Sequence, residues 1–215
     1  VGTLFDVTGE RMAAERLLHD AVHDHLTGLA NRELFLDRLD QALTFAKLDD
    51  KVKPTVMVID LDRFRQLNVQ VGMAVGDAIL LTVARRLMRL MKPQDTLARM
   101  AGDQFGLILL SERDPERITT FADTLRRSLR APITFAEKEV FVTASIGLVL
   151  SGAEVGQRDD VIKDAELAMY YAKRIGGDRI EVFRPAMRQQ KIDRVALESE
   201  LRQALELNQI AVRYQ

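Results

Sequence analysis

The sequence predicts an α+β domain in which helices flank a mixed, mainly antiparallel sheet. Three observations support this fold class. A continuous apolar run at 55–60 is typical of a strand buried on both faces. Pairs of strand-like segments follow it, and amphipathic helical segments separate them. With 215 residues and 47% apolar side chains, the chain is long enough to bury a core of its own.

The first expected elements are two helices and the buried strand. Segment 10–24 carries Ala14, Leu18 and Ala21, a narrow seam that fits either a two-helix coiled coil between domains or a single helix docked on its own domain. Asn31 is expected to open a second helix that runs to about residue 48 with its apolar side chains on one face. The buried strand comes next, after Pro54.

The rest of the chain predicts further helices and strands in alternation. Helices are expected at 76–91, 115–130, 159–175 and 197–207. Strands are expected at 96–100, 105–110, 133–135, 140–150 and 180–183. The first two of these strands form a hairpin around a tight turn at Ala101 and Gly102, and the next two form a second hairpin. This order resembles the palm of nucleotide-transferring enzymes more than a doubly wound parallel sheet.

Composition excludes several classes of function. Thirty-one basic and 32 acidic side chains leave a formal charge of −1, so no overall basic field favours nucleic acid as a partner. The absence of cysteine excludes disulfides, thiolate nucleophiles and zinc sites built on sulfur. No run of about 18 apolar residues predicts a membrane segment, and a cytoplasmic location is expected.

Acidic residues at two places in the chain stand out as candidates for chemistry. Asp60 and Asp62 follow the buried strand and, by alternation, share one face. Asp103 lies at the tip of the first hairpin, so it meets Asp60 at one sheet edge if those strands are neighbours. Two carboxylates and the Leu61 carbonyl are hard oxygen ligands suited to Mg²⁺. On the residues alone, solvated turn carboxylates explain the same pattern.

Six stretches of the chain add to this interpretation of the acidic residues. They are 24–32 (DHLTGLANR), 60–68 (DLDRFRQLN), 72–77 with Gly72, Gly76 and Asp77, 99–105 (RMAGDQF), 145–148 (SIGL) and 168–173 (AMYYAK). Together they resemble the GGDEF family of diguanylate cyclase domains over about residues 20–185. The tail from Leu197, with Tyr214 and Gln215, resembles the start of an EAL phosphodiesterase domain, and the first eleven residues are similar to the end of a PAS sensor module.

The resemblance implies roles for individual residues. In this family two GTP-loaded domains meet face to face and form cyclic di-GMP. Asp60, Asp103 and the Leu61 carbonyl would hold Mg²⁺, and Asn68 and Asp77 would read guanine. The phosphates would meet the cations Arg65 and Lys173 and the backbone at Gly102. Lys92 and Asp95 stand where the family has its Arg-x-x-Asp inhibitory site, here vestigial because lysine lacks the planar guanidinium fork.

Departures from the family pattern gather in the catalytic stretch. Ala101 replaces a glycine, and a Cβ there costs about 1–2 kcal/mol if the turn needs a left-handed conformation. Gln104 replaces the catalytic glutamate, and an amide cannot accept the proton of the attacking hydroxyl. Val69 replaces an aspartate, and Gly177 stands where a phosphate-binding arginine is expected. Little or no cyclase activity is therefore expected.

The expected organisation is a sensor end and linker helix at 1–23, a GGDEF domain at 24–185, and a linker with a truncated EAL start at 186–215. The leading hypothesis is a degenerate domain that binds GTP and Mg²⁺ and regulates the adjoining EAL domain. An active but slow cyclase and a nucleotide-free interaction scaffold are the alternatives. The seam at 10–24 leaves a homodimer open.

Overall fold

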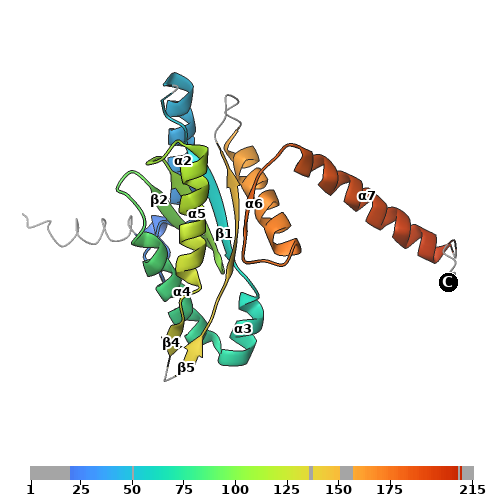
Figure 1. The fold of residues 1–215 in the computed structure, drawn as a ribbon, viewed down its shortest axis with the longest axis horizontal. Coiled ribbons are helices and arrows are strands. Elements are labelled where there is room, and N and C mark those ends of the chain that lie inside the picture. The colour runs from blue at the N-terminus through green and yellow to red at the C-terminus, as the bar shows by residue number, and fades with distance from the viewer. Residues whose placement is uncertain (1–19, 50, 136–137, 151–156, 208, 210–215) are drawn as a thin grey trace, which may run out of the picture.

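The computed structural model of the chain describes residues 20–49, 51–135, 138–150, 157–207 and 209. Its helices are α2 (Arg32–Leu48), α3 (Phe64–Val71), α4 (Met73–Met88), α5 (Pro115–Leu129), α6 (Arg158–Arg174) and α7 (Ala186–Glu206). Its strands are β1 (Thr55–Leu61), β2 (Thr96–Ala101), β3 (Gln104–Leu109), β4 (Ile133–Phe135), β5 (Lys138–Val140), β6 (Ala144–Val149) and β7 (Ile180–Val182). The expected α+β fold is confirmed (Figure 1).

A five-stranded sheet forms the centre of the domain, in the order β2-β3-β1-β6-β7. The pairs β2–β3, β3–β1 and β1–β6 are antiparallel, and β6–β7 is parallel. The central strand β1 is buried at every position except Asp60. This accounts for the continuous apolar run in the sequence, because a strand covered on both faces has no solvent-facing residues to alternate with.

Helices cover both faces of the sheet, so the domain has three layers. On one face, Met57, Ile59 and Leu61 of β1 pack against α4 and α5. On the other, Val56 and Val58 pack against α2 and α6. Asp60 therefore belongs to the face covered by α2 and α6, since alternate strand residues share a face. Asp60, the one residue of β1 that is not fully buried, lies at the strand end nearest the C-terminal end of α6.

Side-chain caps set the N-terminal ends of two helices. Asn31 accepts a hydrogen bond from the Leu34 N–H at 3.1 Å and begins α2, as expected. Asp114 accepts from the Glu116 and Arg117 N–H groups at 2.9 and 3.0 Å and begins α5. Pro115 then occupies the first helical position, where a missing N–H is harmless.

Two expectations are corrected by the structure. The second hairpin does not form as predicted, because β4 pairs with β5 in a separate two-stranded sheet while β6 joins the central sheet beside β1. The apolar pattern of 140–150 shows that a strand is buried but does not identify its partner. The eight-residue helix α3 was not predicted, and α4 begins at Met73 rather than Gly76.

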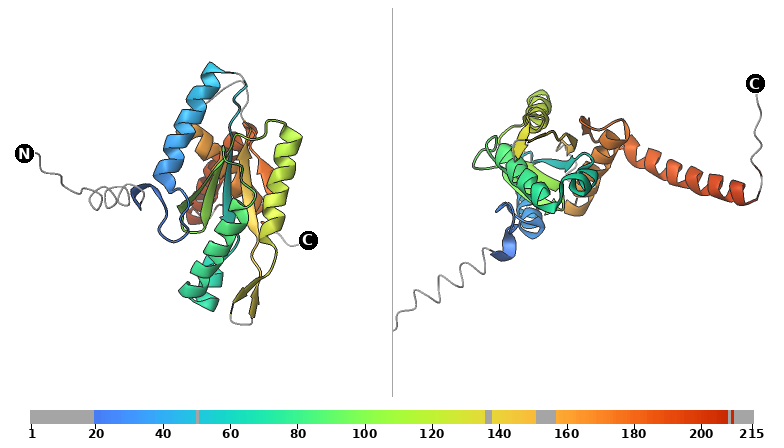
Figure 2. Two further views of the ribbon diagram at one scale, coloured as in Figure 1. Left: turned by 90° about the vertical axis from the view of Figure 1, so that its left-hand side faces the viewer. Right: turned by 90° about the horizontal axis from the view of Figure 1, so that it is seen from below.

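Helix α7 leaves the body of the domain and projects from it (Figures 1 and 2). The helix predicted at 197–207 is its C-terminal part. Most of the predicted linker helix at 10–24 lies outside the described residues. Of its described part, residues 20–22 are helical. Among the described residues, no helix is both long and apolar enough to cross a membrane.

Candidate functional site

Asp60 and Asp103 come from neighbouring segments at one end of the sheet. Strands β1 and β3 are adjacent and antiparallel, with Asp60 opposite Gln104, the residue after Asp103. The Leu61 N–H donates to the Asp103 carbonyl oxygen at 3.3 Å, which ties the end of β1 to the β2–β3 turn. The pairing of strands thus brings together the two carboxylates and the Leu61 backbone that the sequence singled out.

The turn itself is one residue later than predicted. Ala101 is the last residue of β2 and pairs with Gln104, so Gly102 and Asp103 make the two-residue turn. Gly102 has φ +55°, whereas Ala101 is not among the described residues with positive φ. Glycine at the first turn position is typical of a type II′ hairpin. The left-handed strain considered for Ala101 is therefore not incurred, and its methyl group acts only by its bulk at this exposed edge.

Lys173 contributes the positive charge of the site. It lies in the last turn of α6 and forms an ion pair with the Asp60 carboxylate. Burial raises the pKa of Asp60, and the negative charges of Asp103 and Asp62 raise it further, while the hydrogen bond and charge of Lys173 act in the opposite direction. Asp60 thus lies in a concentration of negative charge that attracts cations.

Asp62 makes contacts that sequence reasoning did not assign to it. Its Oδ2 accepts from Thr143 Oγ1 at 2.7 Å and from the Asp178 N–H at 2.8 Å, and its Oδ1 accepts from Ser145 Oγ at 2.7 Å. Ser145 is the partner of Asp60 in the β1–β6 register, so the expectation that Asp60 and Asp62 share a face holds. The sequence signal was the pair of alternating carboxylates. The donors that bind Asp62 lie more than 80 residues away along the chain, so a local sequence pattern could not reveal them.

Asn68 and Asp77 lie on consecutive helices that are in close contact. An ideal Cβ on Gly76 of α4 would lie 1.9 Å from Asn68 Oδ1, so the Asn68 side chain occupies the space that only a glycine leaves open. Asn68 Oδ1 is buried and has no hydrogen-bond partner, while Asp77 is exposed on α4. The contact at Gly76 therefore holds the two expected base-reading residues near one another.

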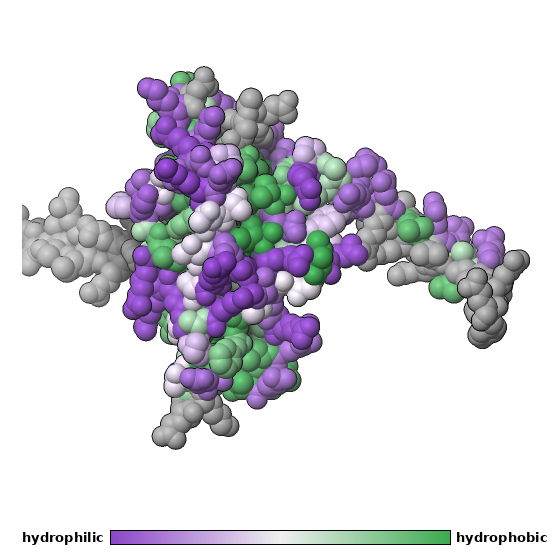
Figure 3. Space-filling model, viewed as in Figure 1, coloured by the Kyte–Doolittle hydropathy of each residue, from purple (hydrophilic) through white to green (hydrophobic). Residues whose placement is uncertain are grey.

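The surface around these two helices is partly apolar. Val69 and Met73 are 83% and 69% exposed at the junction of α3 and α4. Figure 3 shows apolar side chains at the surface over this end of the molecule. Arg65, the expected phosphate cation of α3, is exposed. Valine at 69 thus places an apolar side chain directly beside Asn68, where the family pattern has an acidic one.

Lys92 and Asp95 differ in their surroundings. Asp95 is buried and accepts hydrogen bonds from the N–H groups of Lys92, Leu110 and Ser111 and from Ser111 Oγ, at 2.9–3.1 Å. These bonds fasten the loop before β2 to the end of β3. The Lys92 side chain is exposed. Asp95 therefore acts as a structural acceptor, and its carboxylate is largely saturated by the protein itself.

Gly177 lies against Asp62 in the loop between α6 and β7. Its φ is +73°, and an ideal Cβ there would lie 3.1 Å from the carboxylate atoms of Asp62. A longer side chain in this backbone conformation would be strained and would crowd the carboxylate. The loop is thus shaped around a glycine.

The donor set fits a magnesium ion that is shared with a ligand. Among the described residues, no group of three or more His, Cys, Asp or Glu side chains could hold a metal ion. Asp60, Asp103 and the Leu61 carbonyl offer fewer oxygens than six-coordinate Mg²⁺ requires, and Mg²⁺ is usually completed by water and substrate phosphates. The site suits Mg²⁺ bound together with phosphate oxygens rather than a closed structural metal site.

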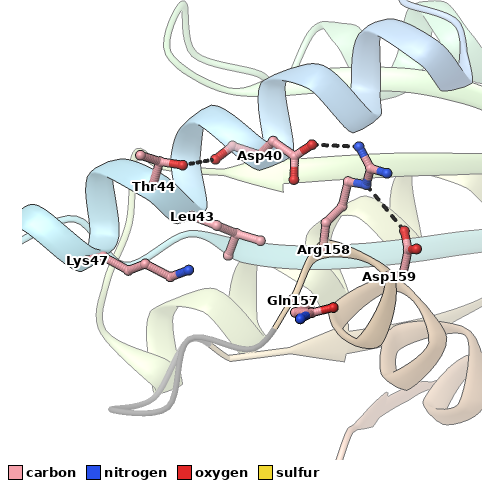
Figure 4. A pocket seen from close by; sticks show the side chains of 7 residues that line it. All are labelled: Asp40, Leu43, Thr44, Lys47, Gln157, Arg158 and Asp159. Atoms are coloured by element: carbon pink, nitrogen blue, oxygen red, sulfur yellow. Dashed lines mark hydrogen bonds and ion pairs between the residues drawn. The ribbon is translucent and has the colours of Figure 1, made fainter.

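A separate hollow of about 280 Å³ lies between α2 and the N-terminal end of α6 (Figure 4). Arg158 lies in it between Asp40 and Asp159, at 2.5 and 3.2 Å. Arg158 and Lys173 are at opposite ends of α6, about 22 Å apart at the helical rise per residue. Arg158 is neutralised by Asp40 and Asp159, while Lys47 of α2 also lines the hollow, which is distinct from the Asp60 site.

Comparison with known proteins identifies the family and relatives of the chain. The family model described as "Diguanylate cyclase, GGDEF domain" matches residues 21–179. The chain is 36% identical over 203 residues to the bifunctional diguanylate cyclase/cyclic di-GMP phosphodiesterase MucR of Pseudomonas aeruginosa, covering 94% of this chain and 29% of that protein. It is 35% identical over 210 residues to the cyclic di-GMP phosphodiesterase PdeR of Escherichia coli, covering 98% and 31%. The chain thus spans about a third of these relatives.

Solved structures show the same fold. The coiled coil and GGDEF domain of DgcB from Caulobacter crescentus, in complex with c-di-GMP, superposes with a TM-score of 0.76 at 27% identity, over 82% of this chain and 93% of that one. The GGDEF domain of TpbB from Pseudomonas aeruginosa gives a TM-score of 0.74 at 31% identity, over 78% and 97%.

Proposed function

The chain belongs to the GGDEF family of diguanylate cyclase domains, and we propose that it serves cyclic di-GMP signalling as a GTP-binding regulatory domain with little cyclase activity of its own. The observation that carries this proposal is the position of Asp60. It is held between Lys173 and the β2–β3 turn, with Asp103 and Asp62 adding negative charge around it. A divalent cation with attached phosphates is a chemically matched occupant of that position.

In the proposed complex, Asp60, Asp103 and the Leu61 carbonyl hold Mg²⁺. The bound metal supplies positive charge that neutralises phosphate oxygens. Lys173 and Arg65 contribute further positive charge at the phosphates, and the backbone at Gly102 lies close to them. Asn68 and Asp77 recognise guanine, since a carboxylate accepts from its N–H donors and an amide serves its acceptors. Each role follows from family resemblance together with the juxtapositions described above.

Reduced turnover follows from the chemistry at the turn. Gln104 has the size of the expected glutamate but no basic oxygen of comparable strength, so it cannot take the proton of an attacking hydroxyl. Loss of one general base usually costs about 10²–10⁴-fold in rate. Gly177 provides no side-chain charge for the phosphates. These changes affect the reacting centre while leaving Asp60, Asp103, Asn68 and Asp77 in place.

The proposed regulatory partners are domains of the same parent chain. Residues 1–23 are assigned to the end of a sensor module and a linker helix, 24–185 to the GGDEF domain, and 186–215 to a linker and the start of an EAL domain. Relatives named as phosphodiesterases, such as PdeR, support this arrangement. Helix α7 is joined to α6 through the Arg188–Asp164 ion pair, at 2.5 and 2.7 Å. Because Lys173 lies on α6, ligand at the phosphate site and the position of α7 can be coupled through one helix.

Calorimetry with GTP tests the proposal directly. We expect GTP with Mg²⁺ to bind the chain, Asn68→Ala to weaken GTP binding more than ATP binding, and EDTA to abolish the heat. The control is Asp37→Ala, which removes an exposed carboxylate on α2 that accepts a hydrogen bond from Gln41. No heat up to millimolar GTP would reject nucleotide binding and leave a scaffold that acts through protein contacts alone.

A slow cyclase is the second candidate. Relatives such as TpbB and MucR are named as diguanylate cyclases, and in this chain Asp103 lies in the β2–β3 turn beside the end of β1 that carries Asp60. Prolonged incubation with GTP and chromatography for cyclic di-GMP discriminates between the two. Product that disappears in Asp103→Asn would favour the cyclase, whereas no product alongside measurable GTP binding supports the regulatory domain. Because the family reaction needs two domains, the assay is run at a concentration where the oligomeric state has been measured.

A further inference from the structure

We propose that Asp62 is a positioning residue, which fixes the loop between α6 and β7 and thereby the end of α6 that carries Lys173. The inference rests on the proposed GTP site, to which Lys173 belongs. It assigns to Asp62 a role distinct from that of Asp60, although both carboxylates follow the same strand and share a face. Asp60 pairs with Lys173 at the proposed metal site, whereas Asp62 accepts hydrogen bonds from other segments of the protein.

The Asp62 carboxylate joins three segments that are far apart in the sequence. Thr143 and Ser145 reach it from the start of β6, and the Asp178 N–H reaches it from the loop after α6. A carboxylate offers about four acceptor sites, and three are used here by donors at 2.7–2.8 Å. Little capacity remains for a metal ion.

The loop that Asp62 holds has an unusual backbone. Gly176, Gly177 and Asp178 have φ values of +116°, +73° and +48° in succession. Three consecutive residues in this region need outside contacts to stay there, and for Asp178 the left-handed conformation is itself costly. The hydrogen bond from its N–H to Asp62 is one such contact, and the close packing of Gly177 on the carboxylate is another.

The same loop is bonded to the end of α6. The Gly176 N–H donates to the Lys173 carbonyl at 3.2 Å, and the Gly177 N–H donates to the Ala172 carbonyl at 3.1 Å. The loop therefore closes the last turn of α6 at Lys173 itself. A displacement of the loop would loosen that turn and the ion pair of Lys173 with Asp60.

Asp178 is anchored on its other side by α5. Its carboxylate forms ion pairs with Arg126, at 2.8 Å, and with Arg130. The loop is thus held between α5 and the end of β1, with Asp62 providing the contact on the side of the site. Removal of the Asp62 contact leaves the anchor to α5 intact, so the fold is expected to survive the substitution.

Two variants separate positioning from metal binding. Asp62→Ala removes all three acceptor contacts. Asp62→Asn keeps an oxygen for the Asp178 N–H and Thr143, and its amide can donate to the Ser145 hydroxyl, but it carries no charge. The matched control is Asp114→Ala, which removes a carboxylate that accepts two backbone N–H groups at the far end of α5.

Three measurements are made on each variant. These are the thermal unfolding temperature, hydrogen exchange of the Asp178 amide, and the affinity for GTP with Mg²⁺. For Asp62→Ala we expect the Asp178 amide to exchange roughly tenfold faster or more and GTP affinity to fall roughly tenfold, the size of one lost hydrogen bond to a charged group. For Asp62→Asn both quantities should stay within about threefold of the unaltered chain. Asp114→Ala should lower the unfolding temperature without changing the exchange rate of the Asp178 amide or the affinity for GTP.

The outcomes are distinguishable. The proposal would be overturned if Asp62→Ala bound GTP as tightly as Asp114→Ala does. It would also be overturned if Asp62→Asn bound GTP as weakly as Asp62→Ala, since that result assigns the effect to charge. If the unaltered chain binds no GTP, the proposed function fails. The exchange rate of Asp178 in the three variants still decides whether Asp62 holds the loop.

Discussion

The Asp24 carboxylate accepts hydrogen bonds from the Arg99 guanidinium at 3.1 and 3.2 Å. The same guanidinium donates through Nε to the Gly102 carbonyl oxygen at 2.9 Å. Arg99 therefore connects the segment before α2 to the turn that carries Asp103. Its side chain is 14% exposed, so solvent screens the contact only partly.

We predict that Arg99→Met loosens the β2–β3 turn. Loss of the hydrogen bonds to Asp24 and Gly102 should lower the free energy of unfolding by roughly 1.5–3 kcal/mol. GTP affinity should fall as well, because Asp103 follows Gly102 directly. The measurements are urea denaturation and calorimetry. An Arg99→Met variant with unchanged GTP affinity would show that the turn keeps its shape without this contact.

The same contact predicts a dependence of stability on pH. Burial by itself raises the pKa of Asp24, but the hydrogen bonds from Thr27 and Arg99 outweigh it and lower the pKa below its usual value. The ionised form is favoured in the folded state, so the stabilisation is present above the ordinary carboxyl pKa and is lost as the pH falls through the lowered one. Asp24→Asn should therefore narrow the difference in unfolding temperature between neutral and acidic pH. A variant that loses stability in acid as steeply as the unaltered chain would contradict this assignment.

The raised pKa of Asp60 predicts the opposite dependence of folding stability on pH. Its pKa is raised by burial and by Asp103 and Asp62, so the folded state favours the protonated form and loses stability as the pH rises through the raised pKa. Asp60→Asn should raise the unfolding temperature at neutral pH in EDTA, while abolishing Mn²⁺ binding measured by electron paramagnetic resonance. The amide oxygen that replaces the carboxylate can still accept from Lys173. An unfolding temperature that falls would show that the ion pair outweighs the cost of burial.

The contact between Asn68 and Gly76 predicts a coupled pair of substitutions. Helix propensity alone would make Gly76→Ala stabilising by about 1 kcal/mol. The methyl group would, however, meet Asn68 Oδ1, so we expect a net destabilisation of roughly 1–2 kcal/mol. Adding Asn68→Ala should remove most of that loss. A double-mutant cycle by chemical denaturation measures the coupling, and two additive substitutions would refute the contact.

The turn predicts how activity could be regained. Replacing Gln104 by Glu restores a carboxylate one residue after Asp103, opposite Asp60. With Ala101→Gly added, cyclic di-GMP formation should rise by roughly 10²-fold or more over the unaltered chain, as chromatography would show. The same pair of changes in an Asp103→Asn background should stay at background. Equal activity with and without the substitutions would show that Gln104 does not limit turnover.

The attachment of α7 can be tested through Asp164, whose side chain is 10% exposed beside Arg188. Asp164→Asn removes the charge of the pair and should speed amide exchange in the first turn of α7 by roughly tenfold. Gln190→Ala, an exposed substitution on the same helix, is the control. No change in exchange would assign the docking of α7 to Met187, which is buried against Leu167 and Ala168.

Much of the fold could be predicted from local sequence. The buried strand, the helix that Asn31 opens and the helix predicted from residue 115 lie where the sequence places them. Helix α3 was missed because it is only eight residues long, half of them polar, and it lacks a side-chain cap. The prediction of the second hairpin was wrong because the apolar pattern of a strand indicates that it is buried but does not identify the strand with which it pairs.

The sequence by itself determined which chemical groups are available, because the carboxylates, the amide and the cations of the site occur in short motifs of fixed spacing. The tertiary structure alone decided what each group does. It separated Asp60, which pairs with Lys173, from Asp62, which binds the loop at Asp178, and it gave Asp95 a structural role. The physical reason is that a carboxylate's role depends on which donors surround it, and those donors come from segments that only the packing of helices on the sheet brings together.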